Sequence, residues 1–327
     1  MNRPDLPELP GTAWRPIGPG DAEAMADLHN ACFEVDRTYR ITPGEMSDEF
    51  ERFGEHADTD STGLFTPGGE LHAFGWSLVP KSGKTEHRSF VWLLVHPQIR
   101  GSVEDVLVDW IEAVAIDRLR AFDDDLPTAM YHHDVFETMV DEIALFERHG
   151  FVPSRYFTEN LRDLSAPIDE SPLDRGLVAR SWSDDVSRDA LAVHNDAFAE
   201  HWGSQPIAPD QWATFHSNEL FQPQMSWVVY DGDVPVAYVQ CSKYPHDWEA
   251  RDRTEAWIEG IGTIESHRGR GIASALITMA MRSFRDDGMQ YAILGVDSEN
   301  GTGANHVYER LGFEVERRMI SFRKPVG

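Results

Sequence analysis

The chain has 327 residues, with 56 acidic against 29 basic side chains and a formal charge of −27. At roughly 150 residues per domain, this length predicts about two domains. Its 41% hydrophobic and 26% charged residues are typical of globular rather than disordered proteins. The acidic excess argues against nucleic acid and anionic membranes as partners. It fits a cationic small molecule or peptide, and equally a simple effect on solubility.

Cysteine usage and the N-terminus bear on the compartment. The two cysteines, Cys32 and Cys241, are too few for a disulfide framework, which fits a reducing environment. Residues 1–7 contain no apolar core of a signal peptide, and no apolar run reaches the roughly 18 residues that span a bilayer. We therefore expect a soluble cytoplasmic protein.

In chain order, three segments of the first half return in the second half, at offsets of about 165 residues. The pairs are Leu28–Phe33 with Val193–Phe198, Leu94–Gly101 with Thr263–Gly269, and Phe146–Phe151 with Tyr308–Phe313. Such internal similarity predicts two copies of one structural unit. The polar, proline-containing stretch 165–172 marks the boundary. We expect domains at 1–165 and 173–327.

Each copy has the same predicted order of elements: a strand, one or two helices, two or three antiparallel strands, a strand–loop–helix, another strand and a last helix. In the second copy, strands are expected at 225–230, 234–242, 255–264 and 291–296, with a hairpin turn at Asp231-Gly232-Asp233. Apolar residues at helical spacing from Ile272 to Phe284 predict an amphipathic helix that ends at Gly288. The predicted fold class is α/β (α+β), with a mixed, mostly antiparallel sheet flanked by helices in each copy.

The loop between the strand at 255–264 and that helix is the most informative segment. Its glycines let successive backbone N–H groups turn toward one point, and the following helix adds its own unsatisfied N–H groups and dipole. This predicts a diphosphate site, although a tight turn without a ligand would have the same glycines. The candidate residues are Arg268, Gly269, Arg270, Gly271, Ile272, Ala273 and Ser274.

The loop resembles the acyl-CoA pyrophosphate loop of GCN5-related N-acetyltransferases (GNAT), with Arg268, Gly271 and Ala273 at the three defined places. Residues 300–313, with an Asn-rich turn, a tyrosine and a Leu-Gly-Phe ending, resemble the family's C-terminal motif. A tandem of two such domains is similar to the mycothiol synthase group of actinobacteria, in which the second domain is catalytic. The resemblance implies acetyl-CoA or another acyl-CoA as co-substrate and no metal.

The resemblance also implies roles for single residues. Tyr308 matches the tyrosine that protonates the departing thiolate, and Asn300 matches an asparagine that contacts the CoA arm. The backbone near Ile261 and Thr263 would pair with the pantetheine. A packed aromatic is the weaker alternative for Tyr308, and for Asn300 a turn residue is an equal one.

Strand alternation predicts that Glu255, Trp257, Glu259, Ile261 and Thr263 share one face. The resemblance implies that the strand holds the acetyl carbonyl near Ile261 and Thr263. Glu259 then stands about one acetyl length upstream of that carbonyl, where a general base belongs. An ordinary exposed carboxylate is the alternative, and Glu255 is the second candidate near the acceptor. The group most similar to this chain carries its base carboxylate near the position that Trp257 occupies here.

After the first helix of the second copy, His201-Trp202-Gly203 lies where the family's acceptor-binding loop is found. His201 is thus a candidate acceptor contact, with a surface histidine as the alternative. Trp202 is expected to form a wall of the same pocket.

At the equivalent loop, the first copy has Val103 in place of the glycine, followed by Glu104 and Asp105. A branched residue resists the tight turn, and carboxylates repel a pyrophosphate. Phe146 replaces the tyrosine and has no proton to donate. We therefore predict that the first copy is degenerate, that it does not bind CoA through this loop, and that it stabilises the second copy or supplies part of the acceptor pocket.

Together these features predict an acyl-CoA-dependent N-acyltransferase that works by direct attack of a primary amine on the thioester. A non-catalytic CoA sensor or partner-binding module on the same scaffold is the alternative. A mycothiol precursor, an aminoglycoside-like antibiotic, a peptide natural product and a protein N-terminus all stay open as acceptors, and the acidic charge favours a cationic amine. His132 and His133 are adjacent and point to opposite strand faces, so no metal site is expected.

Overall fold

The computed structural model describes residues 3–80, 85–201, 204–299 and 304–326. The chain divides into two compact units, which we call unit 1 (Met1–Tyr156 with Met319–Gly327) and unit 2 (Phe157–Arg318). The division falls at residue 157 and not in the stretch 165–172. The C-terminal residues from Met319 onward return to unit 1, which the sequence did not predict.

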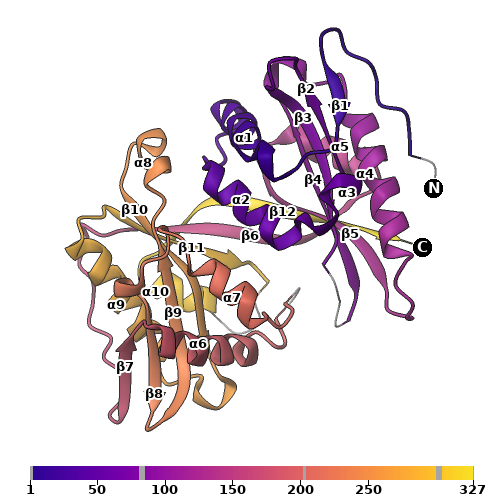
Figure 1. Cartoon of the computed structure of the whole chain (residues 1–327). Coiled ribbons are helices and arrows are strands. Elements are labelled where there is room, and N and C mark those ends of the chain that lie inside the picture. The colour runs from indigo at the N-terminus through magenta and orange to yellow at the C-terminus, as the bar shows by residue number, and fades with distance from the viewer. Residues whose placement is uncertain (1–2, 81–84, 202–203, 300–303, 327) are drawn as a thin grey trace. The chain divides into compact units, whose positions relative to one another are not determined.

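Unit 1 contains helices on a mixed sheet with the strand order β1-β2-β3-β4-β5-β12 (Figure 1). Strands β4 and β5 pair in parallel, and α4 connects them. The elements are β1 (Ala13–Arg15), α1 (Ala22–Asp36), α2 (Pro43–Phe53), α3 (Ala57–Asp60), β2 (Ser61–Phe65), β3 (Leu71–Leu78), β4 (His87–Val95), α4 (Glu104–Leu119), β5 (Thr128–Phe136) and α5 (Val140–Arg148).

Unit 2 repeats this plan, with the strand order β6-β11-β10-β9-β8-β7. Here β10 and β11 are the parallel pair, and α9 connects them. The elements are β7 (Leu177–Ser181), α6 (Asp184–Ala197), α7 (Pro209–Phe215), β8 (Trp227–Asp231), β9 (Val234–Ser242), α8 (Pro245–Arg251), β10 (Glu255–Thr263), α9 (Ile272–Asp286), β11 (Tyr291–Asp297) and α10 (Ala304–Arg310). The predicted strands and long helix are confirmed within two residues, whereas α8 was not predicted.

The two copies exchange their last strands. β6 (Val152–Asp163) follows the first copy's last helix, yet it pairs with β11 of unit 2. β12 (Glu314–Val326) follows the second copy's last helix, yet it pairs with β5 of unit 1. Each unit is therefore completed by a strand from the other copy of the repeat.

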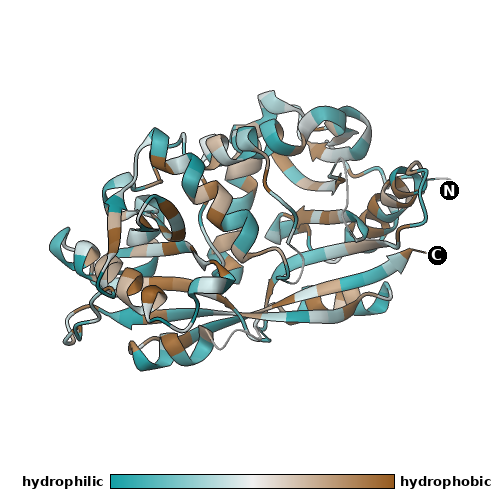
Figure 2. Cartoon of the chain, turned by 90° about the horizontal axis from the view of Figure 1, so that it is seen from below, coloured by the Kyte–Doolittle hydropathy of each residue, from teal (hydrophilic) through white to brown (hydrophobic). Residues whose placement is uncertain are grey.

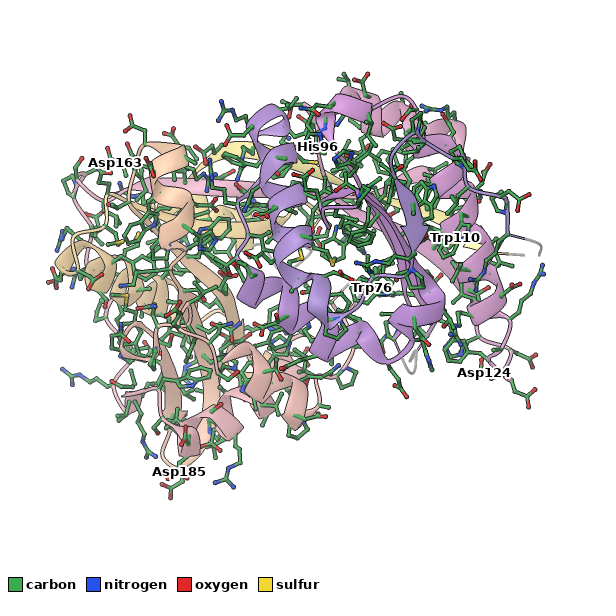
Figure 3. The ribbon with its side chains drawn as sticks, turned by 45° about the horizontal axis from the view of Figure 1, so that its top comes forward. Trp76, His96, Trp110, Asp124, Asp163 and Asp185 are labelled. Atoms are coloured by element: carbon green, nitrogen blue, oxygen red, sulfur yellow. The ribbon has the colours of Figure 1, made fainter. Side chains whose placement is uncertain are left out.

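Apolar faces of the helices form the cores against these sheets. The face of α9 predicted from its spacing is buried against β9, β10 and β11, including Ile272, Leu276 and Phe284. Along the helices, brown apolar residues alternate with teal polar ones (Figure 2). In unit 1, Trp76 lies among the strands at 1% exposure, while Asp185 at the start of α6 points outward (Figure 3). Within the described ranges, none of the helices has the length and apolar character to cross a membrane.

One repeated residue has the same structural task in both units. The Asn30 amide exchanges two hydrogen bonds with the backbone of Ile41, at 3.0 Å each. The Asn195 amide does the same with the backbone of Ile207, at 3.1 and 2.8 Å. Each asparagine thereby ties the first helix of its copy to the segment before the second helix, so this part of the repeat is explained by the fold.

In both units the two parallel strands, β4 with β5 and β10 with β11, stop pairing about halfway along their length. The pairing of β10 with β11 ends at Ile258 and Leu294, and the pairing of β4 with β5 ends at Phe90 and Tyr131. Beyond these points the facing edges of the strands carry backbone N–H and C=O groups without a strand partner. Such backbone groups need another hydrogen-bond partner. The two units differ in which groups take this place.

Candidate active site

The loop before α9 forms an open cradle of backbone N–H groups. Gly269 and Gly271 both have φ of +74°, and a Cβ atom on either would meet nothing within 4 Å. In the described part of the chain, no group accepts a hydrogen bond from the N–H groups of residues 271–274. A helix N-terminus with free N–H groups and a left-handed glycine before it suits a phosphate. Phosphate binding by Gly269, Gly271, Ile272, Ala273 and Ser274 stays a prediction that this geometry allows.

The two arginines of this loop lie differently from one another. The Arg268 guanidinium donates to the carbonyl oxygens of Thr263 (3.2 Å) and Ala197 (3.1 Å), so it ties the loop to β10 and α6. Arg270 is exposed and forms ion pairs with Asp174 (3.2 Å) and Asp231 (3.5 Å). Arg268 therefore stabilises the loop by hydrogen bonds, while Arg270 is an exposed cation beside the cradle.

A β-bulge at Glu259 corrects the predicted alternation. Ile258 pairs with Cys241 and Gly260 pairs with Gln240, so Glu259 is the extra residue. A bulge reverses the faces of the residues that follow it. Ile261 and Thr263 consequently lie on the α9 side of the sheet, opposite to Glu255 and Trp257. Both Ile261 and Thr263 follow the point where β10 leaves β11, so their backbone borders the opening between these strands.

At the bulge, the Glu259 carboxylate contacts Tyr244. The Tyr244 hydroxyl donates to it at 2.9 Å, and the Tyr244 ring packs edge-on against Trp257. The Glu259 side chain is exposed by surface area, and desolvation by neighbouring protein groups raises the pKa of its carboxyl. The hydrogen bond from Tyr244 acts in the opposite direction. A carboxyl with a raised pKa is a stronger base once it is ionised.

Tyr308 lies on α10, 8% exposed, and packs edge-on against Phe313. Burial raises the pKa of its phenol to about 12, so the hydroxyl is protonated at neutral pH. Within the described ranges, its oxygen has no hydrogen-bond partner. A protonated phenol with a free hydrogen is a suitable proton donor. Asn300 of the same motif falls outside the described residues.

Of the predicted acceptor contacts, Glu255 is corrected by the structure. Its carboxylate is 1% exposed and is held by Arg251 and Arg253, so it serves as a buried ion pair and is closed to a ligand. His201 lies beside the end of β11, with Nε2 3.7 Å from the Asp297 carboxylate. Trp202 falls outside the described residues.

In unit 1, the loop equivalent to the cradle is filled by its own side chain. Val103 has φ of −133° where Gly271 has +74°. The Glu104 carboxylate accepts hydrogen bonds from the N–H groups of Gly101 (2.7 Å) and Val103 (3.1 Å). A carboxylate thus already sits on the N–H groups that would receive a phosphate.

The opening between β4 and β5 is filled as well. The His132 ring hydrogen-bonds to the carbonyl of Val91 at 2.9 Å and to Glu142 at 2.6 Å, and it stacks on Phe146 with ring centroids 3.7 Å apart. Trp92 occupies the register position of Gly260, and its ring packs against Phe74 and stacks on Trp76. Aromatic rings therefore take up the space that glycine leaves in unit 2.

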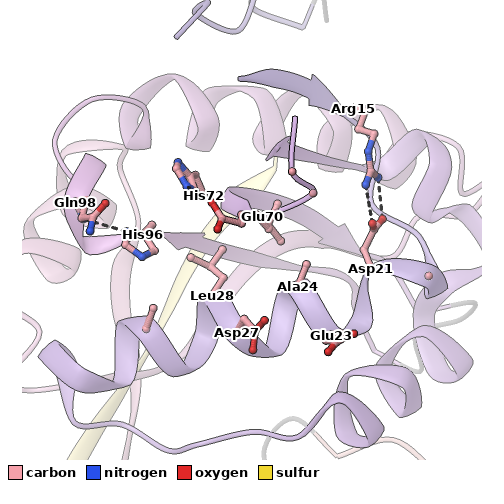
Figure 4. A pocket seen from close by; sticks show the side chains of 15 residues that line it. Arg15, Asp21, Glu23, Ala24, Asp27, Leu28, Glu70, His72, His96 and Gln98 are labelled. Atoms are coloured by element: carbon pink, nitrogen blue, oxygen red, sulfur yellow. Dashed lines mark hydrogen bonds and ion pairs between the residues drawn. The ribbon is translucent and has the colours of Figure 1, made fainter. Parts of the chain in front are cut away.

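A cleft of about 710 Å³ opens elsewhere in unit 1, between α1 and the β2–β3 turn (Figure 4). Asp27 and Leu28 of α1 point toward it, and His72 and His96 line the far side. In the part of the chain that the structure describes, no cluster of three or more His, Cys, Asp or Glu side chains could hold a metal ion.

Sequence reasoning missed Tyr244, Tyr238 and Gln240, which surround the bulge. The signal was Gly260, since an isolated glycine within a strand often marks a bulge or a close approach. Here a Cβ atom on Gly260 would lie 2.9 Å from the Tyr238 hydroxyl.

The chain resembles known proteins in sequence. Residues 189–313 match the model of the acetyltransferase (GNAT) family. A mycothiol acetyltransferase from Corynebacterium efficiens is 27% identical over 43% of this chain and 45% of its own length. One from Parafrankia sp. is 26% identical over 56% of this chain and 62% of its own length, and one from Rhodococcus erythropolis is 26% identical over 72% and 75%. The chain thus spans less than two thirds of the first two relatives.

Solved structures share the fold over nearly the whole chain. A GCN5-related N-acetyltransferase from Sphaerobacter thermophilus is 24% identical, with a TM-score of 0.72 over 98% of this chain and 97% of that one. A tandem GNAT protein from the clavulanic acid biosynthesis pathway is 15% identical, with a TM-score of 0.66 over 97% and 99%. At these identities the likeness concerns the fold.

Proposed function

We propose that unit 2, in which residues 189–313 match the model of the acetyltransferase (GNAT) family, transfers the acetyl group of acetyl-CoA to a primary amine. The observation that carries this proposal is the combination, in one unit, of an open N–H cradle before α9 with an open strand edge after Ile258. The pyrophosphate would bind the first and the pantetheine would pair with the second. In unit 1 both places are occupied by side chains of the protein.

The residues of unit 2 supply the remaining steps. The neutral amine attacks the thioester carbonyl carbon, and the tetrahedral intermediate collapses as the carbon–sulfur bond breaks. Glu259, directly or through a water, takes the proton that the amine nitrogen loses. Tyr308 donates its proton to the departing CoA thiolate and recovers one from solvent. The products are the N-acetyl amine and free CoA.

The net negative charge of the chain bears on the class of acceptor amine. The chain carries 27 more negative than positive formal charges, and a negative field concentrates cations near its surface. This supports a cationic amine and leaves a mycothiol precursor, an aminoglycoside-like compound, a peptide and a protein N-terminus as acceptors. The sequence relatives that are named for mycothiol add weight to the first of these.

The test is acetyl transfer to a panel of amines that represents these classes: L-cysteinamide, glucosamine, kanamycin and an N-terminally free peptide. Release of CoA thiol and the mass of the product are followed for the wild type and for Gly271→Glu. Amine-dependent thiol release by the wild type, absent in the variant, supports the proposal. Acetyl-CoA binding without transfer to any amine would contradict it.

A further inference from the structure

One glycine of unit 2 is exposed in the interior of its sheet. Gly295 belongs to β11, which lies between β6 and β10, and it is exposed although Leu294 and Val296 beside it are only 2% and 5% exposed. A Cβ atom on Gly295 would meet no atom of the described residues within 4 Å, apart from its chain neighbours. Its φ lies outside the left-handed region, so the backbone conformation does not require glycine. The missing side chain therefore leaves open space above the strand.

This space is on the face of the sheet away from α9. Leu294 and Val296 belong to the core cluster that α9 covers. Because side chains alternate between the two faces of a strand, Gly295 and Ile293 face the other side. The open space is thus separated by the sheet from the helix that follows the N–H cradle.

The Glu259 carboxylate lies on the same side as the open space. Trp257 pairs with Ile293 across β10 and β11, so these two side chains share a face. The ring of Tyr244 packs edge-on against Trp257, and its hydroxyl donates to Glu259 at 2.9 Å. The candidate base therefore stands on the face to which Gly295 points.

Gly295 is also the first residue of β11 beyond the last pair with β10. That pair is Ile258 with Leu294, and both side chains are buried in the core under α9. A pantetheine arm that starts at the cradle and pairs first with Thr263 and then with Ile261 brings its thioester end toward this pair. The arm ends there, because the two strands are hydrogen-bonded to one another. With the α9 side filled by the core, the acyl group leaves the sheet over Gly295.

We propose that the transferred acyl group lies over Gly295 and that the absence of a side chain there determines which acyl groups fit. This inference rests on the proposed function and adds a donor specificity to it. A carbon atom at the Cβ position of Gly295 has no described neighbour at the van der Waals distance of about 3.5–4.0 Å. The space therefore takes the methyl group of an acetyl donor and also the longer chain of propionyl-CoA.

In unit 1 the equivalent position carries an aromatic ring. Phe90 and Trp257 are equivalent, because each pairs with the last residue of the strand before it. Counted from their partners in β5 and β11, His133 stands at the position of Gly295. The centroids of the His133 and Phe90 rings are 5.1 Å apart, and Nδ1 of His133 lies 2.6 Å from the Ser321 hydroxyl oxygen. The copy with the filled loop therefore fills this space as well.

Substitutions at Gly295 are suitable tests because they should not impair folding. A glycine inside a strand weakens it, and the added Cβ meets open space, so Gly295→Ala and Gly295→Val should raise the Tm by about 1–3 °C. The Kd of CoA without an acyl group should be unchanged, since the arm ends before position 295. Gly20→Ala, at an exposed glycine of unit 1 with an equally open Cβ position, is the matched control. A lower Tm in both Gly295 variants would show that the space is not open and would overturn the inference.

The activity test compares acetyl-CoA and propionyl-CoA with the best amine of the panel. We expect the wild type to use propionyl-CoA with kcat/KM within about 10-fold of that for acetyl-CoA. Gly295→Ala should lower kcat/KM for propionyl-CoA at least about 10-fold more than for acetyl-CoA, the effect typical of one methylene group. Gly295→Val should lower both values, by about 100-fold for acetyl-CoA.

The ratio of the two donors separates a specificity role from a structural one, which would lower both rates equally. An unchanged donor ratio in Gly295→Ala, or full acetyl transfer by Gly295→Val, would overturn the inference while amine acetylation stands. A wild type that acetylates amines but rejects propionyl-CoA would overturn it as well. No amine-dependent thiol release by the wild type with either donor would defeat the proposed function and the inference together.

Discussion

The two copies of the repeat differ in how the backbone groups of their helix-preceding loop and of their strand edge are hydrogen-bonded. Both have a glycine-containing loop before a helix and a parallel strand pair that separates halfway. In unit 1 the Glu104 carboxylate satisfies the loop and the His132 ring satisfies the strand edge. In unit 2, within the described residues, no side chain accepts from the N–H groups of residues 271–274, and Arg268 takes only the Thr263 carbonyl at the strand edge. This difference between the copies supports the proposal that unit 2 is the one that binds acyl-CoA.

Both copies keep what the fold itself requires. Arg100 and Arg268 each donate from Nε to a carbonyl five residues back, at 3.4 and 3.2 Å. The asparagines of the first helices form the same pair of hydrogen bonds in each unit. This arginine therefore has a structural role that is kept when the loop is filled. The differences, and not the shared residues, locate the chemistry.

The largest effect is expected from placing a carboxylate at the loop of unit 2, as Glu104 does from a neighbouring position in unit 1. Gly271→Glu places a carboxylate at the cradle and should weaken acetyl-CoA binding at least about 100-fold, or about 2.7 kcal/mol. Gly271→Ala is the matched control, because it imposes the same left-handed strain without the charge, at about 1–2 kcal/mol of stability. Isothermal titration of both variants checks this. Normal acetyl-CoA binding by Gly271→Glu would show that the loop is not the anion site.

Removing the base should have the next largest effect. Glu259→Gln is expected to lower kcat by about 10²- to 10⁴-fold. Because desolvation raises the pKa of Glu259, kcat of the wild type should fall, as pH decreases, at a higher pH than an ordinary glutamate would give. This acid limb should be absent from Glu259→Gln. The exposed Glu219→Gln serves as the control, and an unaltered acid limb in Glu259→Gln would assign the base elsewhere.

Copying the aromatic residue of unit 1 should have a smaller effect. Tyr308→Phe mimics Phe146 and removes only the hydroxyl. We expect kcat to fall by about 10²-fold and the acetyl-CoA Kd to stay constant, since the proton is needed only as the thiolate leaves. Steady-state rates and titrations separate the two, with Tyr291→Phe in the same unit as control. Full turnover in Tyr308→Phe would reduce the tyrosine to a packing role.

The smallest effect is expected from opening the loop of unit 1. Glu104→Ala frees the N–H groups of Gly101 and Val103, but His132 still closes the strand edge. No second acetyl-CoA site should form, and stability should fall by about 0.5–1 kcal/mol from the lost first-turn carboxylate. Thermal unfolding and titration stoichiometry check this. A second site in the variant would mean that the loop alone decides binding.

Much of this contrast could be predicted from sequence, because it depends on residue types at aligned positions. Val103, Glu104 and Phe146 indicated a degenerate copy, and the structure adds how Glu104 occupies the loop. The exchange of last strands could not be predicted, since β6 and β12 follow equivalent helices and either pairing would suit their sequences. The structure alone showed that both oxygens of Glu255 are taken by arginines.

The β-bulge at Glu259 is the feature of the site that sequence reasoning missed with the largest consequence. Period-two alternation assigns one face to residues 255–263, and a single extra residue reverses the second half of that assignment. Gly260 signalled it, but the register shift against Gln240 is visible only in the paired strands. The groups that now surround Glu259, above all Tyr244, come from β9 and the turn before α8, distant in sequence from the motifs of the loop.

The most direct test of the central claim is an isothermal titration of acetyl-CoA into the wild-type chain, read for stoichiometry. The account predicts one site per chain, abolished by Gly271→Glu and unaffected by Glu104→Ala. Two sites per chain, or one site that survives Gly271→Glu, would contradict the assignment of acyl-CoA binding to unit 2 alone.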